Sequence, residues 1–173
     1  MIIREERPSD IEAITEVTIA AFKTCRYGNH TEQFIIKALR AAGALAVSLV
    51  ADDGGTVVGH IAFSAVTICG QRYGWYSMGP VSVRPDRQRQ GIGKSLINEG
   101  LRMLKEAGAK GCVLVGEPEY YEKFGFRNLP ELTLEGVPKE NFLALPFGEN
   151  RAQGPVVFHE GFRNQGPPNA LRG

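Results

Sequence analysis

The sequence lacks the marks of a disulfide-stabilised, metal-binding or membrane-spanning protein. Its three cysteines, Cys25, Cys69 and Cys112, form no C-x-x-C pair and leave an odd number. This pattern argues against a disulfide framework and a cysteine zinc site, and no other metal-ligand spacing occurs. No apolar run reaches the roughly 18–20 residues that cross a bilayer. Residues 1–6 become charged at once, without the apolar core of a secretory signal. We therefore expect a cytoplasmic protein with no metal and no membrane partner.

An excess of charge of one sign is also absent. The 20 Lys and Arg residues nearly balance the 19 Asp and Glu residues, which gives a formal net charge of +1. Such a balance provides no global attraction to nucleic acid, and we expect no nucleic-acid partner. The length of 173 residues and the hydrophobic content of 43% are typical of one globular domain with a sizeable core.

Hydrophobic periodicity predicts one α/β domain over residues 1–163 and a flexible tail over residues 164–173. The predicted order is β-α-α-β-β-β-α-β-α-β-β, a mixed central sheet of about seven strands flanked by about four helices. Ser9, with Glu12 three residues later, is typical of a helix cap. Gly59 and Gly79 interrupt apolar strands and indicate bulges or close approach of another backbone. The expected strands cover 2–4, 45–51, 56–68, 73–83, 112–115, 142–145 and 156–159, and the longest expected helix covers 91–106.

Residues 81–94 carry the strongest chemical signal in the sequence. A strand end is followed by a cationic loop with Gly91 and Gly93, and then by an amphipathic helix. The first N–H groups of a helix lack partners within the helix, and the helix dipole favours an anion there. Glycine lets a ligand approach the backbone closely. The loop is therefore predicted to bind a polyphosphate, with added positive charge from Arg84, Arg87, Arg89 and Lys94.

Two common phosphate-binding motifs do not match this loop. A Walker A loop needs a glycine five residues before Gly93, where the sequence has Gln88. The dinucleotide fingerprint needs a third glycine, where the sequence has Leu96. An NTPase or a Rossmann protein is therefore disfavoured.

A different motif does match. The run Gln-Arg-Gln-Gly-Ile-Gly at residues 88–93, after a Val-x-Val-x-Pro strand end, resembles the acyl-CoA-binding motif of the GNAT family of N-acetyltransferases. The run Tyr-Glu-Lys-Phe-Gly-Phe at residues 121–126 resembles the family's second signature, and the element order is that of the family's fold. The double tyrosine, residues 77–81 and the Gly59-His60 pair are similar to the bacterial YhbS-like branch.

The resemblance implies transfer of an acetyl group from acetyl-CoA to a primary amine by direct attack in a ternary complex. In the family, pantetheine enters a gap between the fourth and fifth strands, and a backbone N–H near Val81 polarises the thioester carbonyl. Tyr121 stands where the family protonates the departing thiolate. The implied catalytic residues are Tyr121 and Val81, and the implied cofactor-binding residues are Val81, Ser82, Val83, Gln88, Arg89, Gln90, Gly91, Ile92, Gly93, Lys94, Tyr121 and Phe124.

Several points stay open at the level of the sequence. Tyr120 is an alternative acid. The position that supplies a base in some relatives holds Ser77, so a water chain or another residue must serve, and Glu32, Glu117 and His30 are candidates by chemistry alone. His60 and His159 lie in apolar segments and are expected to be structural. The acceptor is expected to be a small amine, an amino acid or a peptide, with residues 25–30, including Arg26 and Tyr27, as a candidate lining. A homodimer and a non-catalytic acyl-CoA sensor are the remaining alternatives.

Overall fold

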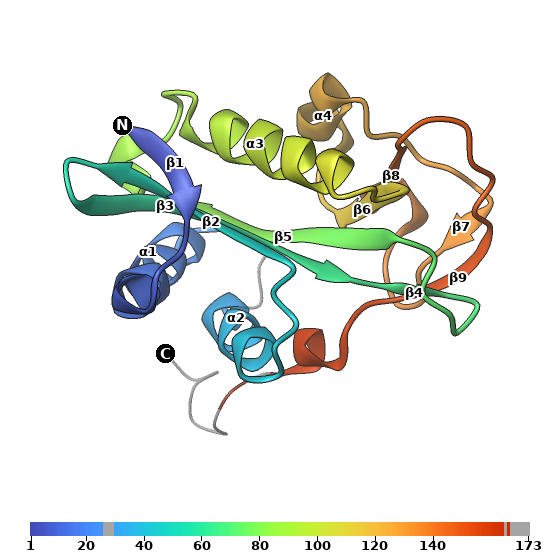
Figure 1. Ribbon diagram of the computed structural model, residues 1–173, viewed down its shortest axis with the longest axis horizontal. Helices are drawn as coiled ribbons and strands as arrows, with labels where there is room; N and C mark the ends of the chain where they lie inside the picture. Colours follow the sequence, from blue (N-terminus) through green and yellow to red (C-terminus); the bar gives the residue numbers. More distant parts are fainter. Residues whose placement is uncertain (26–29, 165, 167–173) are drawn as a thin grey trace.

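The computed structural model describes residues 1–25, 30–164 and 166, and its centre is a six-stranded mixed sheet (Figure 1). The strand order is β1-β2-β3-β5-β6-β8, and only the β5–β6 pair is parallel. The predicted α/β fold with a mixed sheet is confirmed. These strands are β1 (Ile2–Glu5), β2 (Val47–Asp53), β3 (Thr56–Ala65), β5 (Trp75–Val83), β6 (Gly111–Val115) and β8 (Phe142–Pro146).

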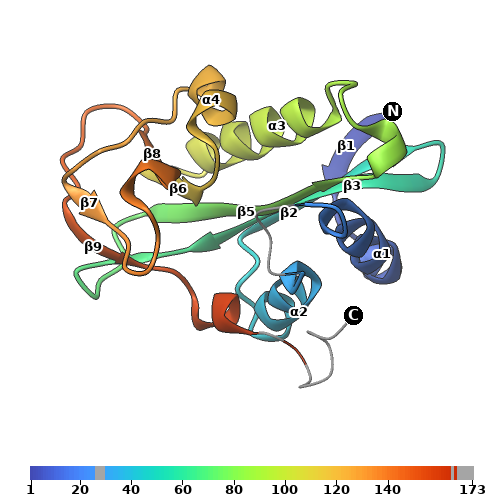
Figure 2. The ribbon, with the colours of Figure 1, turned by 180° about the vertical axis from the view of Figure 1, so that it is seen from behind.

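Helices cover both faces of this sheet. Helices α1 (Ile11–Phe22) and α2 (Glu32–Ala41) lie on one face, and α3 (Ile92–Glu106) and the short α4 (Pro118–Tyr121) lie on the other (Figures 1 and 2). Among the described residues, no helix combines the length and the apolar character needed to cross a bilayer.

Helix α3 packs on the sheet through the face that its apolar periodicity predicts. Its inward side chains are all buried, and they are Ile92, Leu96, Ile97, Leu101 and Leu104. Two glycines allow the close approach. A Cβ on Gly59 of β3 would lie 3.1 Å from side-chain atoms of α3, and a Cβ on Gly100 of α3 would lie 2.2 Å from Cε2 of Phe63. Burial of this face stabilises the helix and fixes the position of its N-terminus against the end of β5.

A second, three-stranded sheet was not anticipated as a separate unit. The strand expected over 56–68 breaks at Val66, and its end forms β4 (Thr67–Ile68) in the order β4-β9-β7. Strands β7 (Leu132–Thr133) and β9 (Gly154–Val157) complete it. A separate apolar cluster that includes Val66, Trp75 and Val156 fills the space beside it.

The first helix begins differently from its predicted cap. A 3-10 turn, Pro8–Asp10, precedes α1, and the carboxylate of Asp10 accepts a hydrogen bond of 2.7 Å from the backbone N–H of Arg7. Arg4 also donates to Asp10. The expected Ser9 and Glu12 cap is therefore wrong. Ser9 lies inside the 3-10 turn, and the carboxylate of Asp10, held by Arg4 of β1, closes that turn and does not cap α1.

Strands β5 and β6 separate toward the C-terminal end of β5. Their parallel pairing covers only residues 75–77 of β5. The β3–β5 register shifts between Ile61 and Phe63, which places one extra residue in β5 at Gly79 and Pro80. Such a bulge bends a strand away from regular pairing. The bulge expected at Gly79 is confirmed, and beyond it β5 runs beside an open gap.

Two sequence predictions fall mainly outside the described residues. Of the expected tail over 164–173, only 164 and 166 are described. Of the expected acceptor lining over 25–30, Arg26 and Tyr27 lie outside the described part of the chain.

Candidate active site

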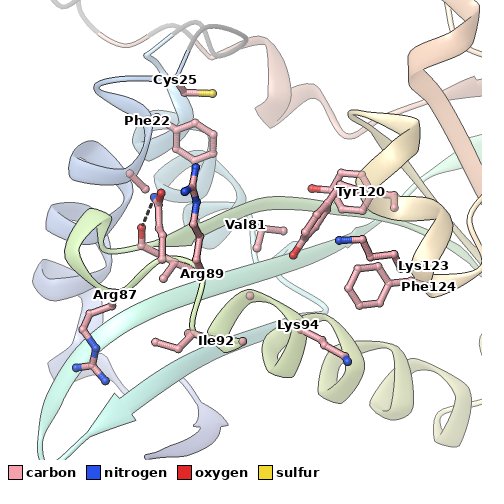
Figure 3. A pocket seen from close by; sticks show the side chains of 16 residues that line it. Phe22, Cys25, Val81, Arg87, Arg89, Ile92, Lys94, Tyr120, Lys123 and Phe124 are labelled. Carbon is pink, nitrogen blue, oxygen red and sulfur yellow. Dashed lines mark hydrogen bonds between the residues drawn. The ribbon is translucent and has the colours of Figure 1, made fainter.

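A cavity of about 570 Å³ lies where β5 leaves β6 (Figure 3). Its floor is the end of β5, one wall is the loop that leads into α3, and the opposite wall comes from α4 and the turn after it. The C-terminal end of α1 closes a third side with Ala21 and Phe22. Most of the predicted cofactor residues line it together: Val81, Val83, Gln88, Arg89, Gly91, Ile92, Gly93, Lys94, Tyr121 and Phe124.

Beyond Ser77, the cavity-facing side of β5 has no strand partner among the described residues. The N–H of Arg84 donates to the carbonyl of Val58 at 2.8 Å, and Ser82 lies opposite His60 two residues earlier. In an antiparallel pair, the residues between such hydrogen-bonded pairs direct their N–H and C=O groups to the other side. Val81 and Val83 therefore direct their backbone groups into the gap beside β6.

Two side chains at this end of β5 have structural contacts. The side chain of Gln88 donates to the carbonyl of Val83 at 3.0 Å and ties the loop to the strand end. Ser82 is buried on the α1 side, with Oγ 3.5 Å from Oγ1 of Thr18. Ser82 therefore faces away from the cavity, and only its backbone remains near the predicted ligand.

The N-terminus of α3 opens onto the cavity. The amide of Ser95 donates to the carbonyl of Gly91 at 3.0 Å, which is the first bond of the helix. The amides of residues 92–94 therefore have no carbonyl within the helix to bind. Gly91 has φ +85° and Arg89 has φ +63°, so the chain turns sharply into the helix. This arrangement directs several amide N–H groups and the positive end of the helix dipole to one place.

Of the four basic residues in the loop and the start of α3, two are ion-paired. Arg84 pairs with Asp86 at 2.6 Å, and Arg87 pairs with Asp53 at 2.8 Å. Figure 3 shows Arg89 pointing across the cavity mouth toward Phe22, whereas Arg87 points away from it. Within residues 1–25, 30–164 and 166, Arg89 and Lys94 have no ion pair and both line the cavity. They are the cations best placed to meet an anionic ligand.

The adjacent tyrosines differ in burial. Tyr121 lies deep in the cavity wall, its ring centroid 6.3 Å from that of Phe126, and burial raises its pKa to about 12. Tyr120 is 39% exposed, and burial raises its pKa as well. The hydroxyl of Tyr120 would lie 3.4 Å from a Cβ on Gly93, so it reaches toward the N-terminus of α3. Lys123 lies over the Tyr120 ring with Nζ 4.8 Å from the centroid.

The other titratable candidates separate into structural and cavity-lining groups. Ser77 is buried and donates to the carbonyl of Ser64 at 3.2 Å, consistent with the expectation that it is not a base. His159 accepts a hydrogen bond from the N–H of Gly161 at 2.9 Å and caps a turn, and His60 is buried in β3. His30 is exposed.

Glu32 and Glu117 line a second cavity beside the first. The described residues contain no group of three or more His, Cys, Asp or Glu side chains that could hold a metal ion.

Sequence reasoning missed the contribution of α1 to the cavity. Ala21 and Phe22 sit at the end of an ordinary amphipathic helix. No local signal distinguishes them, because their place in the site depends on how α1 crosses β5.

Similarity to known proteins agrees with this geometry. Residues 44–128 match the family described as "Acetyltransferase (GNAT) domain". The chain is 36% identical over 127 residues to "Uncharacterized N-acetyltransferase YhbS" of Escherichia coli (strain K12), covering 73% of each chain. The fold is similar to that of a GNAT family acetyltransferase from Brucella melitensis in complex with acetyl-CoA, with 50% identity, a TM-score of 0.84, and coverage of 93% of this chain and 97% of that one.

Escherichia coli YhbS in complex with CoA is a second structural match, with 31% identity, a TM-score of 0.87, and coverage of 95% of this chain and 93% of that one. These similarities confirm the resemblance that residues 88–93 and 121–126 carry, including its YhbS-like branch. The chain belongs to the GNAT family of N-acetyltransferases.

Proposed function

We propose that this protein transfers an acetyl group from acetyl-CoA to a primary amine by direct attack within a ternary complex. The observation that carries the proposal is the gap between β5 and β6, which has free backbone groups at Val81, unpaired helix amides at one end and Tyr121 at the other. Relatives of the same fold have been crystallised with acetyl-CoA and with CoA, which supports the choice of donor.

The donor would lie along the gap. The pyrophosphate of CoA would bind the amides of residues 89–94, with Arg89 and Lys94 adding charge. The amides of pantetheine would bond to the backbone of Val81 and Val83, as an added strand does at a sheet edge. The thioester would then lie at Val81, whose N–H would donate to the carbonyl oxygen and stabilise the oxyanion by a few kcal/mol.

The reaction needs one nucleophile and one acid. The uncharged amine attacks the carbonyl carbon, a C–N bond forms and the C–S bond breaks. The nitrogen, which is positively charged after the attack, loses one proton to water, and the thiolate of CoA accepts a proton. Tyr121 is the proposed donor of that proton, because its half-buried side chain lines the cavity and its raised pKa keeps the hydroxyl protonated at neutral pH. The pKa near 12 also means that Tyr121 is a hydrogen-bonding acid and not a base at neutral pH.

A pair of tyrosine variants tests the proposal. We expect Tyr121→Phe to lower kcat by about 10²-fold with the amine that reacts fastest, which is the lower end of the usual contribution of a general acid. The Kd for CoA should stay unchanged. Tyr120→Phe is the matched control and should lower kcat much less. The measurement is thiol release from acetyl-CoA, with CoA affinity from isothermal titration. Equal loss in both variants would contradict the assignment of the acid to Tyr121.

Two further outcomes separate the alternatives. Cys25 lines the cavity, so a covalent acyl-enzyme is testable: Cys25→Ala should retain turnover, and mass spectrometry should find no acetylated enzyme after incubation with acetyl-CoA alone. A folded protein that binds acetyl-CoA but releases no thiol with any amine would instead indicate a sensor domain.

A further inference from the structure

A second cavity, of about 540 Å³, adjoins the first at the proposed point of reaction. The two cavities share five lining residues, Phe22, Cys25, Val81, Tyr120 and Tyr121. The second cavity also reaches Gly116 and Glu117, which follow the end of β6. An acceptor seated there would approach the thioester from the side opposite the nucleotide end of CoA.

The second cavity has a mainly apolar wall built from distant parts of the chain. Its lining comes from α2, the middle of β5, the loop after β7 and the C-terminal 3-10 turn, η5 (Glu160–Arg163), with the segment just before it. Apolar and aromatic side chains dominate this lining: Ile35, Met78, Leu134, Val137, Phe158 and Phe162. Pockets of this size and character bind molecules with a substantial apolar body.

The charged residues that line this wall are both acidic. They are Glu32, at the first turn of α2, and Glu117, which is exposed. Glu32 is only 8% exposed, and its Oε2 is buried without a hydrogen-bond partner among the described residues. A buried carboxylate oxygen without a partner is costly, and a cation that bonded to it would offset that cost.

We propose that the second cavity holds the acceptor, a primary amine carried on an apolar or aromatic body, and that Glu32 receives its ammonium group. This inference rests on the proposed function and adds the class of acceptor to it. Glu32 binds the charged form of the amine as it enters, and the apolar wall holds the rest of the molecule. The nitrogen then loses one proton to water, which gives the uncharged amine that attacks the thioester. Small polar amines gain nothing from that wall, and acidic amines are repelled by both carboxylates.

The first test compares acceptors. The probes are 2-phenylethylamine and tryptamine against ethanolamine and aspartate, each with acetyl-CoA and thiol release as the readout. The expected result is a kcat/KM at least about tenfold higher for the two aromatic amines, because the apolar wall buries their rings. A preference for ethanolamine or aspartate overturns the inference and leaves the proposed function standing. No thiol release with any amine overturns the proposed function itself, and this inference with it.

The second test uses Glu32→Gln, which keeps the shape of the side chain and removes its charge. The KM for 2-phenylethylamine should rise about tenfold or more, while the Kd for CoA stays the same. Glu119→Gln is the matched control, an exposed glutamate on α4 that lines neither cavity. An unchanged KM in Glu32→Gln overturns the role of Glu32.

If Glu32→Gln does not fold, a variant in the loop after β7 provides the test. Val137→Trp fills part of the cavity from a half-buried loop position that packs against the smaller apolar cluster. The variant should bind CoA normally and lose at least about tenfold in kcat/KM for tryptamine, with a smaller loss for ethylamine. Equal rates for tryptamine in Val137→Trp and the unaltered protein overturn the placement of the acceptor.

Discussion

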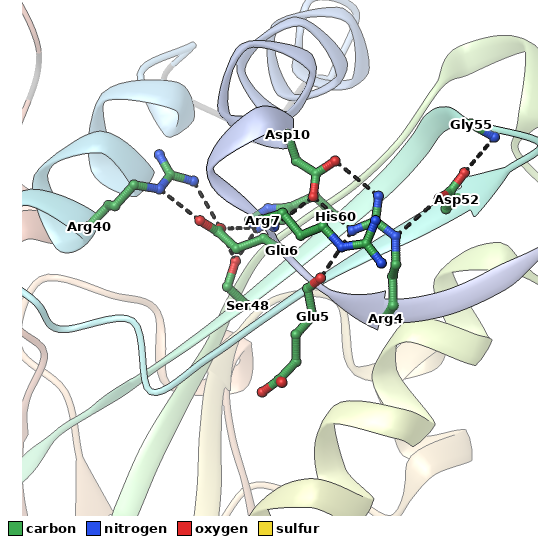
Figure 4. A network of polar contacts seen from close by, with 10 residues as sticks. All are labelled: Arg4, Glu5, Glu6, Arg7, Asp10, Arg40, Ser48, Asp52, Gly55 and His60. Atoms are coloured by element: carbon green, nitrogen blue, oxygen red, sulfur yellow. Dashed lines mark hydrogen bonds and ion pairs between the residues drawn. The ribbon is translucent and has the colours of Figure 1, made fainter.

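The Nε2 atom of the fully buried His60 lies 2.8 Å from the hydroxyl of Ser48, which is half-buried (Figure 4). Ser48 in turn donates to the carboxylate of Glu6, which also accepts two hydrogen bonds of 2.9 Å from Arg40. Since the proton of Ser48 is used for Glu6, the serine oxygen is the acceptor and His60 Nε2 the donor. Nδ1 of His60 has no partner among the described residues, which suits a neutral ring and not a protonated one.

This network predicts a loss of stability in mild acid. Burial lowers the pKa of His60 below its ordinary value of 6.5, although Glu6 opposes the shift. Below pH 6.5 the unfolded chain therefore binds a proton that the folded chain does not, and the free energy of unfolding falls as pH decreases. Urea unfolding between about pH 5 and pH 8 should show a plateau above about pH 7 and a decline below it, by up to about 1.4 kcal/mol per pH unit from this one group.

His60→Gln provides the control for that decline. Glutamine keeps a donor for Ser48 but does not titrate, so the slope between about pH 5 and pH 6.5 should be smaller in the variant. The carboxylate of Glu6 adds its own loss at lower pH. Burial raises the pKa of Glu6, but the nearby His60 and the hydrogen bonds from Arg40 and Ser48 outweigh burial and lower it. An identical pH slope in His60→Gln and the unaltered protein would contradict the assignment to His60.

Two glycines in the predicted phosphate loop should respond differently to alanine. A Cβ on Gly93 would make ordinary contacts, 3.4 Å from the Tyr120 hydroxyl and 3.7 Å from Val83, so Gly93→Ala should fold with an equal or higher Tm. Its methyl group would nevertheless occupy the place proposed for the pyrophosphate, and the Kd for CoA should rise about tenfold. Gly91→Ala should instead lose about 1 kcal/mol of stability, because Gly91 has φ +85°.

Thermal unfolding and isothermal titration of CoA measure these two effects. Gly93→Ala with unchanged CoA affinity would place the phosphates elsewhere than the N-terminus of α3.

The two arginines of the loop should also differ in their effect on CoA binding. Arg89 faces the cavity mouth without an ion pair among the described residues, whereas Arg87 pairs with Asp53. Arg89→Ala should raise the Kd for CoA about fivefold, equivalent to about 1 kcal/mol, and should weaken the dependence of binding on salt. Titrations at low and high ionic strength measure both quantities. A larger effect from Arg87→Ala would reverse the assignment.

The sequence predicted those parts of the fold that depend on residues close together along the chain. The apolar spacing of α3 and the two glycines at its start, Gly91 and Gly93, predicted a helix with an open N-terminus, because both signals are local. The pairing of Arg87 with Asp53 was not predictable, because it requires the β2–β3 turn to reach the loop. The break at Val66 depends on β9, which lies some 90 residues later along the chain.

The candidate site likewise has one part that depends on local sequence and one part that depends on contacts between distant segments. The donor cavity is largely one continuous segment of sequence, residues 81–94, joined to a short second motif. The second cavity draws its lining from at least four separate segments, none of which has a motif of its own. Glu32 could be named as a candidate base from its chemistry, but only the packing of α2 buries it and turns it into a specific candidate for binding the acceptor.

Gly116 supports Tyr121, and its replacement should affect chemistry more than donor binding. A Cβ at position 116 would lie 2.5 Å from Cε2 of Tyr121, so Gly116→Ala must displace the ring. Gly116 does not line the donor cavity. We expect kcat to fall about tenfold and the Kd for CoA to change less than about twofold, because misplacing an acid by a fraction of an ångström weakens proton transfer. Steady-state kinetics of the Tyr121→Phe variant, with and without Gly116→Ala, provide the decisive comparison. If Gly116 acts through the Tyr121 hydroxyl, adding Gly116→Ala to Tyr121→Phe should lower kcat little further. Losses in kcat that multiply would show that Gly116 acts by another route.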